Sequence, residues 1–269
     1  MPCLRAESTG PRKLSLHPRL NAYVTMRLKQ KWSPEQIARR IQKEYPHDTT
    51  MRISHETIYQ HLYVLPRGEL KKELIRYLRQ KTRFRKSRLI TQGQQHRGPI
   101  QEMISIEERP QEVSDRSVPG HWEGDLLVGA RSLSCLGTLV ERQTRLVLLV
   151  PLKQRDAVSV REAFAKEIRR LPQQLAKSLT YDQGAEMAEH KKLTFDTKIQ
   201  VYFAHPHSPW ERGTCENTNG LLRQYFPKGI DFHTVSVDQI RLAEKQLNGR
   251  PRKTLNWETP SEAFHRLLH

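Results

Sequence analysis

The first part of the chain has apolar residues at the spacing of short amphipathic helices. One apolar face is formed by Leu20, Tyr23, Val24 and Leu28. A second helix is predicted to begin after Ser33, because serine is a favoured N-cap, Pro34 suits the first turn and Gln36 can complete a capping box. A third helix is predicted to begin after Ser54. Three short helices within about 50 residues favour a helix-turn-helix module.

After Gly120 the pattern changes to the short apolar runs that are typical of strands. Strands are predicted at 121–129, 133–141 and 145–152, and two more at 178–181 and 199–204. Between these two groups, a helix is indicated by the spacing of Ala157, Val160, Phe164, Ile168 and Leu171. Three strands, a helix and two further strands interleaved with helices predict an α/β fold.

The distribution of charge separates the two parts of the chain. The sequence has 269 residues and a net charge of +17. Residues 1–100 contain 22 Lys and Arg against 7 Asp and Glu, whereas the other 169 residues contain 24 against 22. We therefore predict a basic DNA-binding domain at 1–90, a linker at 91–117 and an α/β domain at 118–269. Since phosphate neutralisation drives nucleic-acid binding, DNA is the expected partner; a solvated basic surface is the alternative.

Composition argues against several other classes of protein. No apolar run of about 18 residues is present, so the sequence predicts no membrane span. The first residues lack the apolar segment of a secretory signal. Cys3, Cys135 and Cys215 show no metal-binding spacing, and we interpret them as free thiols in a reducing cytoplasm.

The helix after Ser54 is the candidate for recognition of DNA bases. If it enters the major groove, the candidate base contacts are Ser54, His55, Thr57 and Gln60. A basic cluster further along is interpreted as a phosphate clamp formed by Arg83, Arg85, Lys86 and Arg88. The alternative is a helical domain that only packs, since the stretch from Glu44 to Ile53 is longer than the standard tight turn.

Three carboxylates carry the predicted chemistry. Asp125 lies in the first strand of the α/β part, Asp182 at the end of the fourth strand, and Glu216 at the start of a later helix. Two Mg²⁺ ions about 4 Å apart need oxygen ligands from separate elements, and such ions activate the attacking and leaving oxygens of a phosphodiester. The three residues therefore predict a two-metal site that acts on nucleic acid.

Residues near these carboxylates are candidates for supporting roles. The helix face of Glu216 also carries Asn219, Gly220 and Arg223, and its opposite face is apolar. Glu123 shares the strand face of Asp125, so we interpret it as a group that supports the site or replaces a ligand. The candidate phosphate contacts are Arg212, Arg223, Lys228 and Arg250. The tyrosines interpreted as packing residues, which disfavours a tyrosine recombinase, are Tyr59, Tyr63 and Tyr181.

Taken together, these motifs resemble the DDE transposases of bacterial insertion sequences, specifically the IS-thirty family. The similarity spans residues 20–265. It is carried by the segments 32–37, 54–59, 120–125, 180–182, 207–210 and 216–229, and by the closing segments 248–255 and 259–260. The segment 216–229, which begins Glu-Asn-Thr-Asn-Gly-Leu-Leu-Arg, is the most specific of these.

The resemblance implies an RNase H-like integrase core in which Asp125, Asp182 and Glu216 form the catalytic triad. These residues would hold two Mg²⁺ ions, for which Mn²⁺ can substitute. The implied function is cleavage at the inverted-repeat ends of an insertion element and strand transfer into target DNA. Because two ends must be paired, a homo-oligomer on DNA is expected, without a membrane partner, in the bacterial cytoplasm at the nucleoid.

Two features depart from the family pattern. Family members usually have Asn where this chain has Cys215, and a thiol cannot replace the hydrogen bonds of an amide. Members also usually have a further helix-turn-helix region before the matched segment, so we expect a truncated copy with weakened recognition of its ends. The alternative functions are a non-catalytic DNA-binding copy, acting as a regulator or a relic, and a nuclease of the same fold that only hydrolyses DNA.

Overall fold

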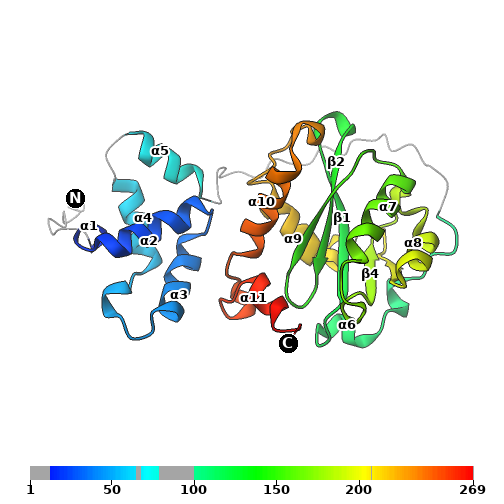
Figure 1. Ribbon diagram of the computed structural model, residues 1–269, viewed down its shortest axis with the longest axis horizontal. Helices are drawn as coiled ribbons and strands as arrows, with labels where there is room; N and C mark the ends of the chain where they lie inside the picture. The colour runs from blue at the N-terminus through cyan, green and yellow to red at the C-terminus, as the bar shows by residue number, and fades with distance from the viewer. Residues whose placement is uncertain (1–12, 65–67, 79–99, 207, 269) are drawn as a thin grey trace, which may run out of the picture. The chain divides into compact units, whose positions relative to one another are not determined.

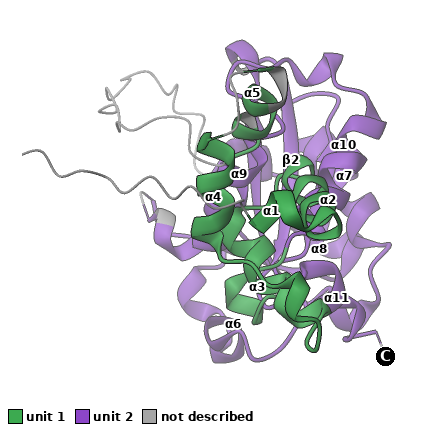
Figure 2. Ribbon diagram, turned by 90° about the vertical axis from the view of Figure 1, so that its left-hand side faces the viewer, with its two compact units in different colours: residues 1–85, 251–258 green, residues 86–250, 259–269 purple. Residues whose placement is uncertain are grey.

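The chain divides into two compact units. The computed structural model describes residues 13–64, 68–78, 100–206 and 208–268. Residues 1–85 and 251–258 form the first unit, and residues 86–250 and 259–269 form the second (Figure 2). In the described part of the chain, no helix is both long enough and apolar enough to cross a membrane.

The first unit is helical, and the two helices predicted to begin after Ser33 and Ser54 do so. Its elements are α1 (Lys13–Leu16), α2 (Pro18–Lys29), α3 (Pro34–Glu44), the 3-10 turn η1 (Thr49–Met51), α4 (His55–Val64) and α5 (Glu69–Arg76) (Figure 1). Gln36 N–H donates to Ser33 Oγ at 3.2 Å and Ser33 N–H donates to Gln36 Oε1 at 2.8 Å, which confirms the capping box. Thr57 N–H donates to Ser54 Oγ at 3.2 Å, so Ser54 caps α4.

The predicted apolar face of α2 lies in the core of this unit. Leu20, Tyr23, Val24 and Leu28 are all buried. They pack in one cluster with residues of the other helices, among them Trp32, Ile37, Ile41, Ile58 and Leu62. The helical spacing in the sequence therefore identified the buried positions correctly.

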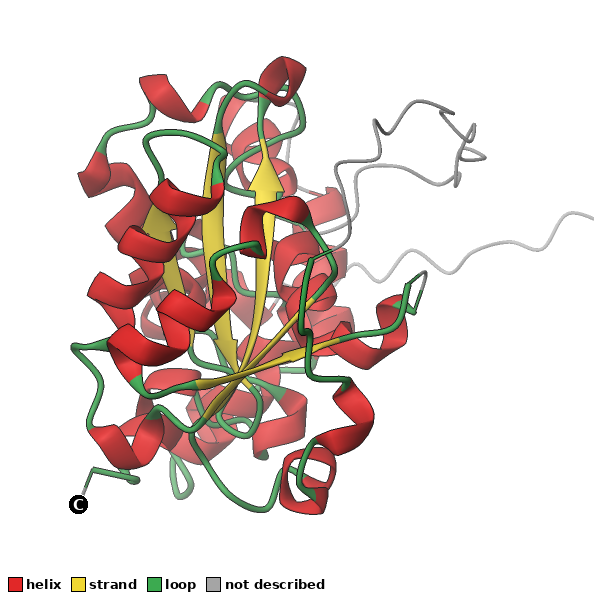
Figure 3. Cartoon of the chain, turned by 90° about the vertical axis from the view of Figure 1, so that its right-hand side faces the viewer, coloured by secondary structure: helices red, strands yellow, loops and turns green. Residues whose placement is uncertain are grey.

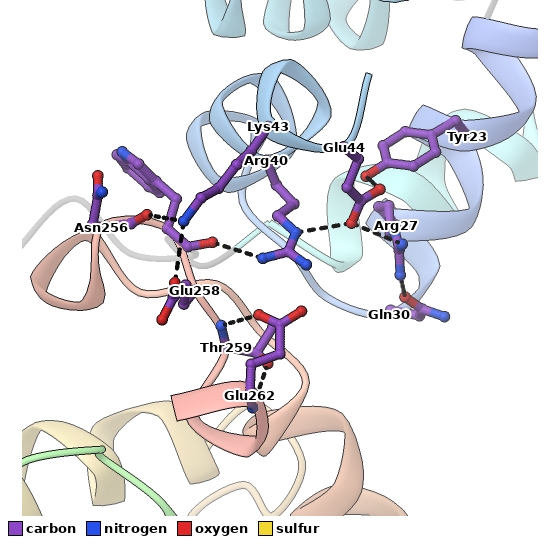
Figure 4. A network of polar contacts seen from close by, with 11 residues as sticks. Tyr23, Arg27, Gln30, Arg40, Lys43, Glu44, Asn256, Glu258, Thr259 and Glu262 are labelled. Carbon is purple, nitrogen blue, oxygen red and sulfur yellow. Dashed lines mark hydrogen bonds and ion pairs between the residues drawn. The ribbon is translucent and has the colours of Figure 1, made fainter. Parts of the chain in front are cut away.

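A segment from near the C-terminus completes the first unit by binding to α3. Arg40 donates to the Trp257 carbonyl at 3.1 Å, and Lys43 donates to the Asn256 carbonyl at 3.2 Å (Figure 4). Arg40 also pairs with Glu44 at 2.8 Å. The helix face that these side chains form is therefore tied to residues more than 200 positions away in the sequence.

The second unit is built on a five-stranded mixed sheet. Its strands are β1 (His121–Val128), β2 (Cys135–Glu141), β3 (Val147–Pro151), β4 (Ser178–Tyr181) and β5 (Gln200–Phe203), in the order β3-β2-β1-β4-β5. Strands β1, β2 and β3 pair antiparallel, whereas β4 runs parallel to β1 and β5 runs parallel to β4. All five predicted strands are confirmed, with ends that differ by a few residues.

Helices cover both faces of this sheet, as Figures 1 and 3 show. The face of Trp122, Leu126 and Tyr181 packs on α7 (Ala157–Ile168) and α8 (His190–Thr197). The face of Leu127 and Leu136 packs on α9 (Gly213–Leu222) and α10 (Val237–Asn248). Two short helices, α6 (Gln111–Asp115) and α11 (Pro260–His265), complete the unit. Alternate residues of β1 thus point to different helices.

Close packing between β2 and α7 gives a test of this arrangement. A Cβ at Gly137 would lie 2.4 Å from Phe164 Cε1 and 3.1 Å from Val150 Cβ. We predict that Gly137→Ala lowers the free energy of unfolding by about 1–3 kcal/mol, because the buried neighbours must move. Gly220 in α9 has no atom within 4 Å of such a Cβ, so Gly220→Ala is the matched control. It should raise stability by about 0.5–1 kcal/mol through helix propensity. Urea unfolding measures the stability of both variants. An equal effect of the two substitutions would contradict the close packing of Gly137 against Phe164.

Candidate active site

The parallel pairing of β1 and β4 brings Asp125 and Asp182 together. His121 pairs with Ser178 and Glu123 with Thr180 in this ladder. The same offset of 57 residues separates Asp125 from Asp182. The two aspartates therefore lie beside each other on neighbouring strands, just beyond these pairs. Because side chains alternate along a strand, both fall on the face that packs on α9. The sequence prediction that adjacent strands place these two residues close together is therefore correct.

The Arg212 guanidinium links the two carboxylates. Arg212 Nη2 donates to Asp182 Oδ2 at 3.0 Å, and Nη1 donates to the Gly124 carbonyl at 3.1 Å and lies 3.6 Å from Asp125 Oδ1. Burial lowers the pKa of the guanidinium, but the carboxylates of Asp182 and Asp125 more than offset this effect, so the net shift of its pKa is upward. Arg212 therefore remains a cation between two acidic side chains.

Asp125 is held in place by further hydrogen bonds. Leu126 N–H donates to Oδ1 at 2.9 Å, and Asn219 Nδ2 donates to Oδ2 at 2.8 Å. Burial raises the pKa of Asp125; the Arg212 guanidinium opposes this rise and the Asp182 carboxylate adds to it. Asn219 Oδ1 is buried and has no hydrogen-bond partner among the residues that the structure describes. An unpaired oxygen next to a carboxylate is a suitable neighbour for a cation or for its bound water.

Glu216 lies in the first turn of α9, at the helical spacing of Asn219 and Arg223. From the same face, Asn219 reaches Asp125, and Arg223 Nη2 donates to the Val128 carbonyl at 3.0 Å. The side chain of Glu216 is exposed. Among the residues that the structure describes, no three His, Cys, Asp or Glu side chains form a group able to hold a metal ion. The structure thus joins Asp125 and Asp182, and places Glu216 one helical turn before Asn219.

A buried carboxylate anchors the start of α9. Glu123 is fully buried, and its Oε2 accepts a hydrogen bond from Cys215 N–H at 2.8 Å. Its Oε1 pairs with Arg142 Nη1 at 2.6 Å, and Arg142 Nε donates to the Val113 carbonyl at 3.1 Å. A carboxylate at a helix N-terminus binds free N–H groups and is favoured by the helix dipole. Glu123 therefore supports the site by positioning the helix that carries Glu216.

The side chain of Cys215 is buried beside Thr138 of β2. It is fully buried, with Sγ 3.5 Å from Thr138 Oγ1, and Thr138 donates to the backbone carbonyl of Asp125 at 3.1 Å. Burial raises the pKa of the thiol well above its usual value. Residue 215 is thus a neutral thiol that contacts Thr138, the residue that donates to the Asp125 carbonyl.

The candidate phosphate contacts occupy different environments. Lys228 is exposed after α9, and Arg223 is partly buried. Arg250 is only 2% exposed, with its guanidinium donating to Gln224 Oε1 and Tyr225 OH at 2.8 Å each. The interpretation of Arg250 as a phosphate contact is therefore wrong, because its side chain lies in the core. Phosphate contact by Arg212, which binds Asp182, and by Arg223 and Lys228 stays a prediction.

On α4, the predicted base-contact residues differ in availability. His55 and Gln60 are exposed, whereas Thr57 is partly buried and Ser54, although exposed, uses its Oγ as a helix cap.

The interpretation of two tyrosines of this helix as packing residues is wrong: Tyr59 and Tyr63 are 36% and 60% exposed and stack on each other at 6.4 Å between ring centroids. Tyr181 is fully buried, as predicted. The predicted phosphate clamp, Arg83, Arg85, Lys86 and Arg88, lies outside the described residues.

Comparison with known proteins gives consistent results. The integrase core domain family matches residues 115–209, which include Asp125 and Asp182. A transposase for insertion sequence element IS1086 from Cupriavidus metallidurans is 49% identical over 90% of this chain and 70% of its own length. Transposase InsI for insertion sequence element IS30A from Escherichia coli is 42% identical over 98% of this chain and 67% of its own length.

Among solved structures, the catalytic core domain of BIV integrase is similar to 56% of this chain and 96% of its own, with a TM-score of 0.43 and 20% sequence identity.

The anchor of α9 gives a stability prediction. We predict that Glu123→Gln lowers the free energy of unfolding by about 3 kcal/mol or more, because it leaves the buried Arg142 charge without its counter-ion. Glu162 is the control: its side chain is 66% exposed and pairs with Arg161 at 3.3 Å. Glu162→Gln should cost less than about 1 kcal/mol. Chemical denaturation with urea separates the two cases, and similar losses in both variants would show that the buried pair does not fix α9.

Proposed function

Because this chain belongs to the IS-thirty family of insertion-sequence transposases, we propose that it cleaves DNA at the ends of its element and joins those ends to target DNA with one carboxylate site. The observation that carries the proposal is the convergence of Asp125 and Asp182 on a single cationic group, Arg212. A site that gathers carboxylate oxygens around positive charge suits divalent ions, which take oxygen ligands. The unpaired Asn219 oxygen beside Asp125 adds a neutral donor to this set.

In the proposed mechanism, Asp125, Asp182 and Glu216 would hold two Mg²⁺ ions, for which Mn²⁺ could substitute. When bound, such ions would activate the attacking oxygen, first of water and then of the freed 3′-hydroxyl, and stabilise the leaving oxygen. The protein's part is to orient these carboxylates. The strand ladder sets the two aspartates, and the Glu123 anchor of α9 sets the position of Glu216. No covalent link between protein and DNA is needed.

DNA recognition is proposed for the basic first part of the chain. The exposed His55 and Gln60 of α4 are available for base edges in a major groove. The exposed Tyr59 and Tyr63 border the same surface and can contribute apolar contact. The proposed DNA partners are the element's inverted-repeat ends and the target, bound by a homo-oligomer at the bacterial nucleoid because two ends must be paired.

The catalytic proposal is tested with supercoiled DNA that carries the element's ends. In Mg²⁺ or Mn²⁺, we expect nicking at the ends followed by joined products. Asp125→Asn, Asp182→Asn and Glu216→Gln should each reduce both products by about 10³-fold or more, since each removes a charged ligand. Binding to the same DNA, measured by fluorescence anisotropy, should stay within about threefold of the unaltered chain.

Two other outcomes would contradict the proposal. Tight, salt-sensitive binding without cleavage by any variant would indicate a non-catalytic regulator. Nicking that never yields joined products would indicate a nuclease that only hydrolyses. Loss of DNA binding in all three variants would mean that they fail to fold or bind, which circular dichroism of each variant separates from a catalytic defect.

A further inference from the structure

The Arg212 guanidinium lies where the two carboxylates require a positive charge. It donates to Asp182 Oδ2 at 3.0 Å and lies 3.6 Å from Asp125 Oδ1. The Arg212 side chain is 16% exposed, whereas those of Asp125 and Asp182 are 30% and 41% exposed. The arginine therefore approaches from the protein side, and the carboxylates stay open to solvent and to ions that arrive from it.

The loop before α9 holds this arginine in a defined position. Arg212 ends the 3-10 turn η6 (Pro209–Arg212). The preceding residue, Glu211, accepts hydrogen bonds from His205 N–H and from His205 Nδ1, each at 2.8 Å. Arg212 Nη1 also donates to the Gly124 carbonyl of β1 at 3.1 Å. The guanidinium is thus fixed to the strand that carries Asp125, and its place between the carboxylates does not depend on one flexible contact.

We propose that Arg212 is a positioning residue that replaces a divalent cation in the metal-free protein and competes with that cation for Asp182. This inference rests on the function proposed above. Without a positive charge, the neighbouring carboxylates of Asp125 and Asp182 would repel each other, so the guanidinium keeps them together before metal arrives. A divalent cation bound to Asp182 would share that carboxylate with Arg212, whose guanidinium already binds Oδ2, so the two cations would repel each other.

Competition and simple support predict opposite effects on metal affinity. If Arg212 competes, removal of its charge weakens the metal-free fold but strengthens metal binding. If Arg212 only supports the metal-loaded site, the same change weakens both. Arg212→Gln removes the charge and keeps a hydrogen-bond donor, whereas Arg212→Lys keeps the charge and loses the planar pair of donors.

The experiment uses the purified full chain without DNA. Free Mn²⁺ is measured by electron paramagnetic resonance during a titration, and thermal unfolding is followed in EDTA. We expect Arg212→Gln to bind Mn²⁺ about tenfold more tightly than the unaltered chain and to unfold at a lower temperature in EDTA. Arg212→Lys should bind Mn²⁺ about threefold more tightly than the unaltered chain. If Arg212→Gln does not fold, this gain or its absence in Arg212→Lys tests the proposal instead.

Two controls separate the possible failures. Arg241 lies between Glu167 at 2.8 Å and Glu244 at 3.0 Å in the same unit, so Arg241→Gln should lower stability without changing Mn²⁺ affinity. Asp182→Asn should bind Mn²⁺ weakly; if it binds as well as the unaltered chain, the proposed metal site itself is wrong. If Asp182→Asn loses binding but the Arg212 variants bind equally or less tightly than the unaltered chain, only the role proposed for Arg212 is overturned.

Discussion

The parallel pairing of β1 with β4 is the constraint on which the candidate site depends. One ladder places Asp125 and Asp182 at the same level of neighbouring strands. Alternation along the strands then sends Trp122 and Tyr181 into the core beneath α7 and α8, and the two aspartates toward α9. A slip of one residue would exchange these faces and put a carboxylate into the apolar core. The same register therefore stabilises the fold and assembles the chemistry.

The helix α9 is tied to the same strand by a second set of contacts. Glu123 binds the N-terminus of the helix at Cys215, and Asn219 reaches Asp125 one turn later. Because Glu123 and Asp125 are two residues apart on β1, the position of α9 is coupled to the position of the first aspartate. The contacts of Glu123 and Asn219 thereby fix the helix that carries Glu216.

Much of the fold could be predicted from the sequence because it follows from local patterns. Three of the strands, β1, β2 and β4, are flanked on both sides by glycine or polar residues, and the capping box at Ser33 marks the start of α3. The offset between Asp125 and Asp182 could not be recognised as a ladder without the strand register. The packing of residues 251–258 on α3, more than 200 positions away, has no local signal at all.

The sequence was least informative about individual arginines and tyrosines. Arg212 and Arg250 are the same residue type in similar polar stretches, yet one holds two carboxylates and the other is buried against Tyr225. Tyr59 and Tyr181 likewise are the same residue type, yet Tyr59 is exposed on α4 and Tyr181 is buried on β4. Long amphipathic side chains suit either setting, so their roles depend on tertiary contacts. The helical spacing places Asn219 on the same face as Glu216, but only the structure shows its hydrogen bond to Asp125.

The most direct test of a shared metal site is local cleavage of the protein chain by a bound metal. Fe²⁺ is bound in place of Mg²⁺. Ascorbate and peroxide then react with the bound Fe²⁺ to produce hydroxyl radicals that cut the backbone beside the ion. If Asp125, Asp182 and Glu216 share the ions, cuts should fall near all three residues and should disappear when excess Mg²⁺ is added. Cuts at other segments, or near Asp125 and Asp182 but never near Glu216, would contradict a three-carboxylate site.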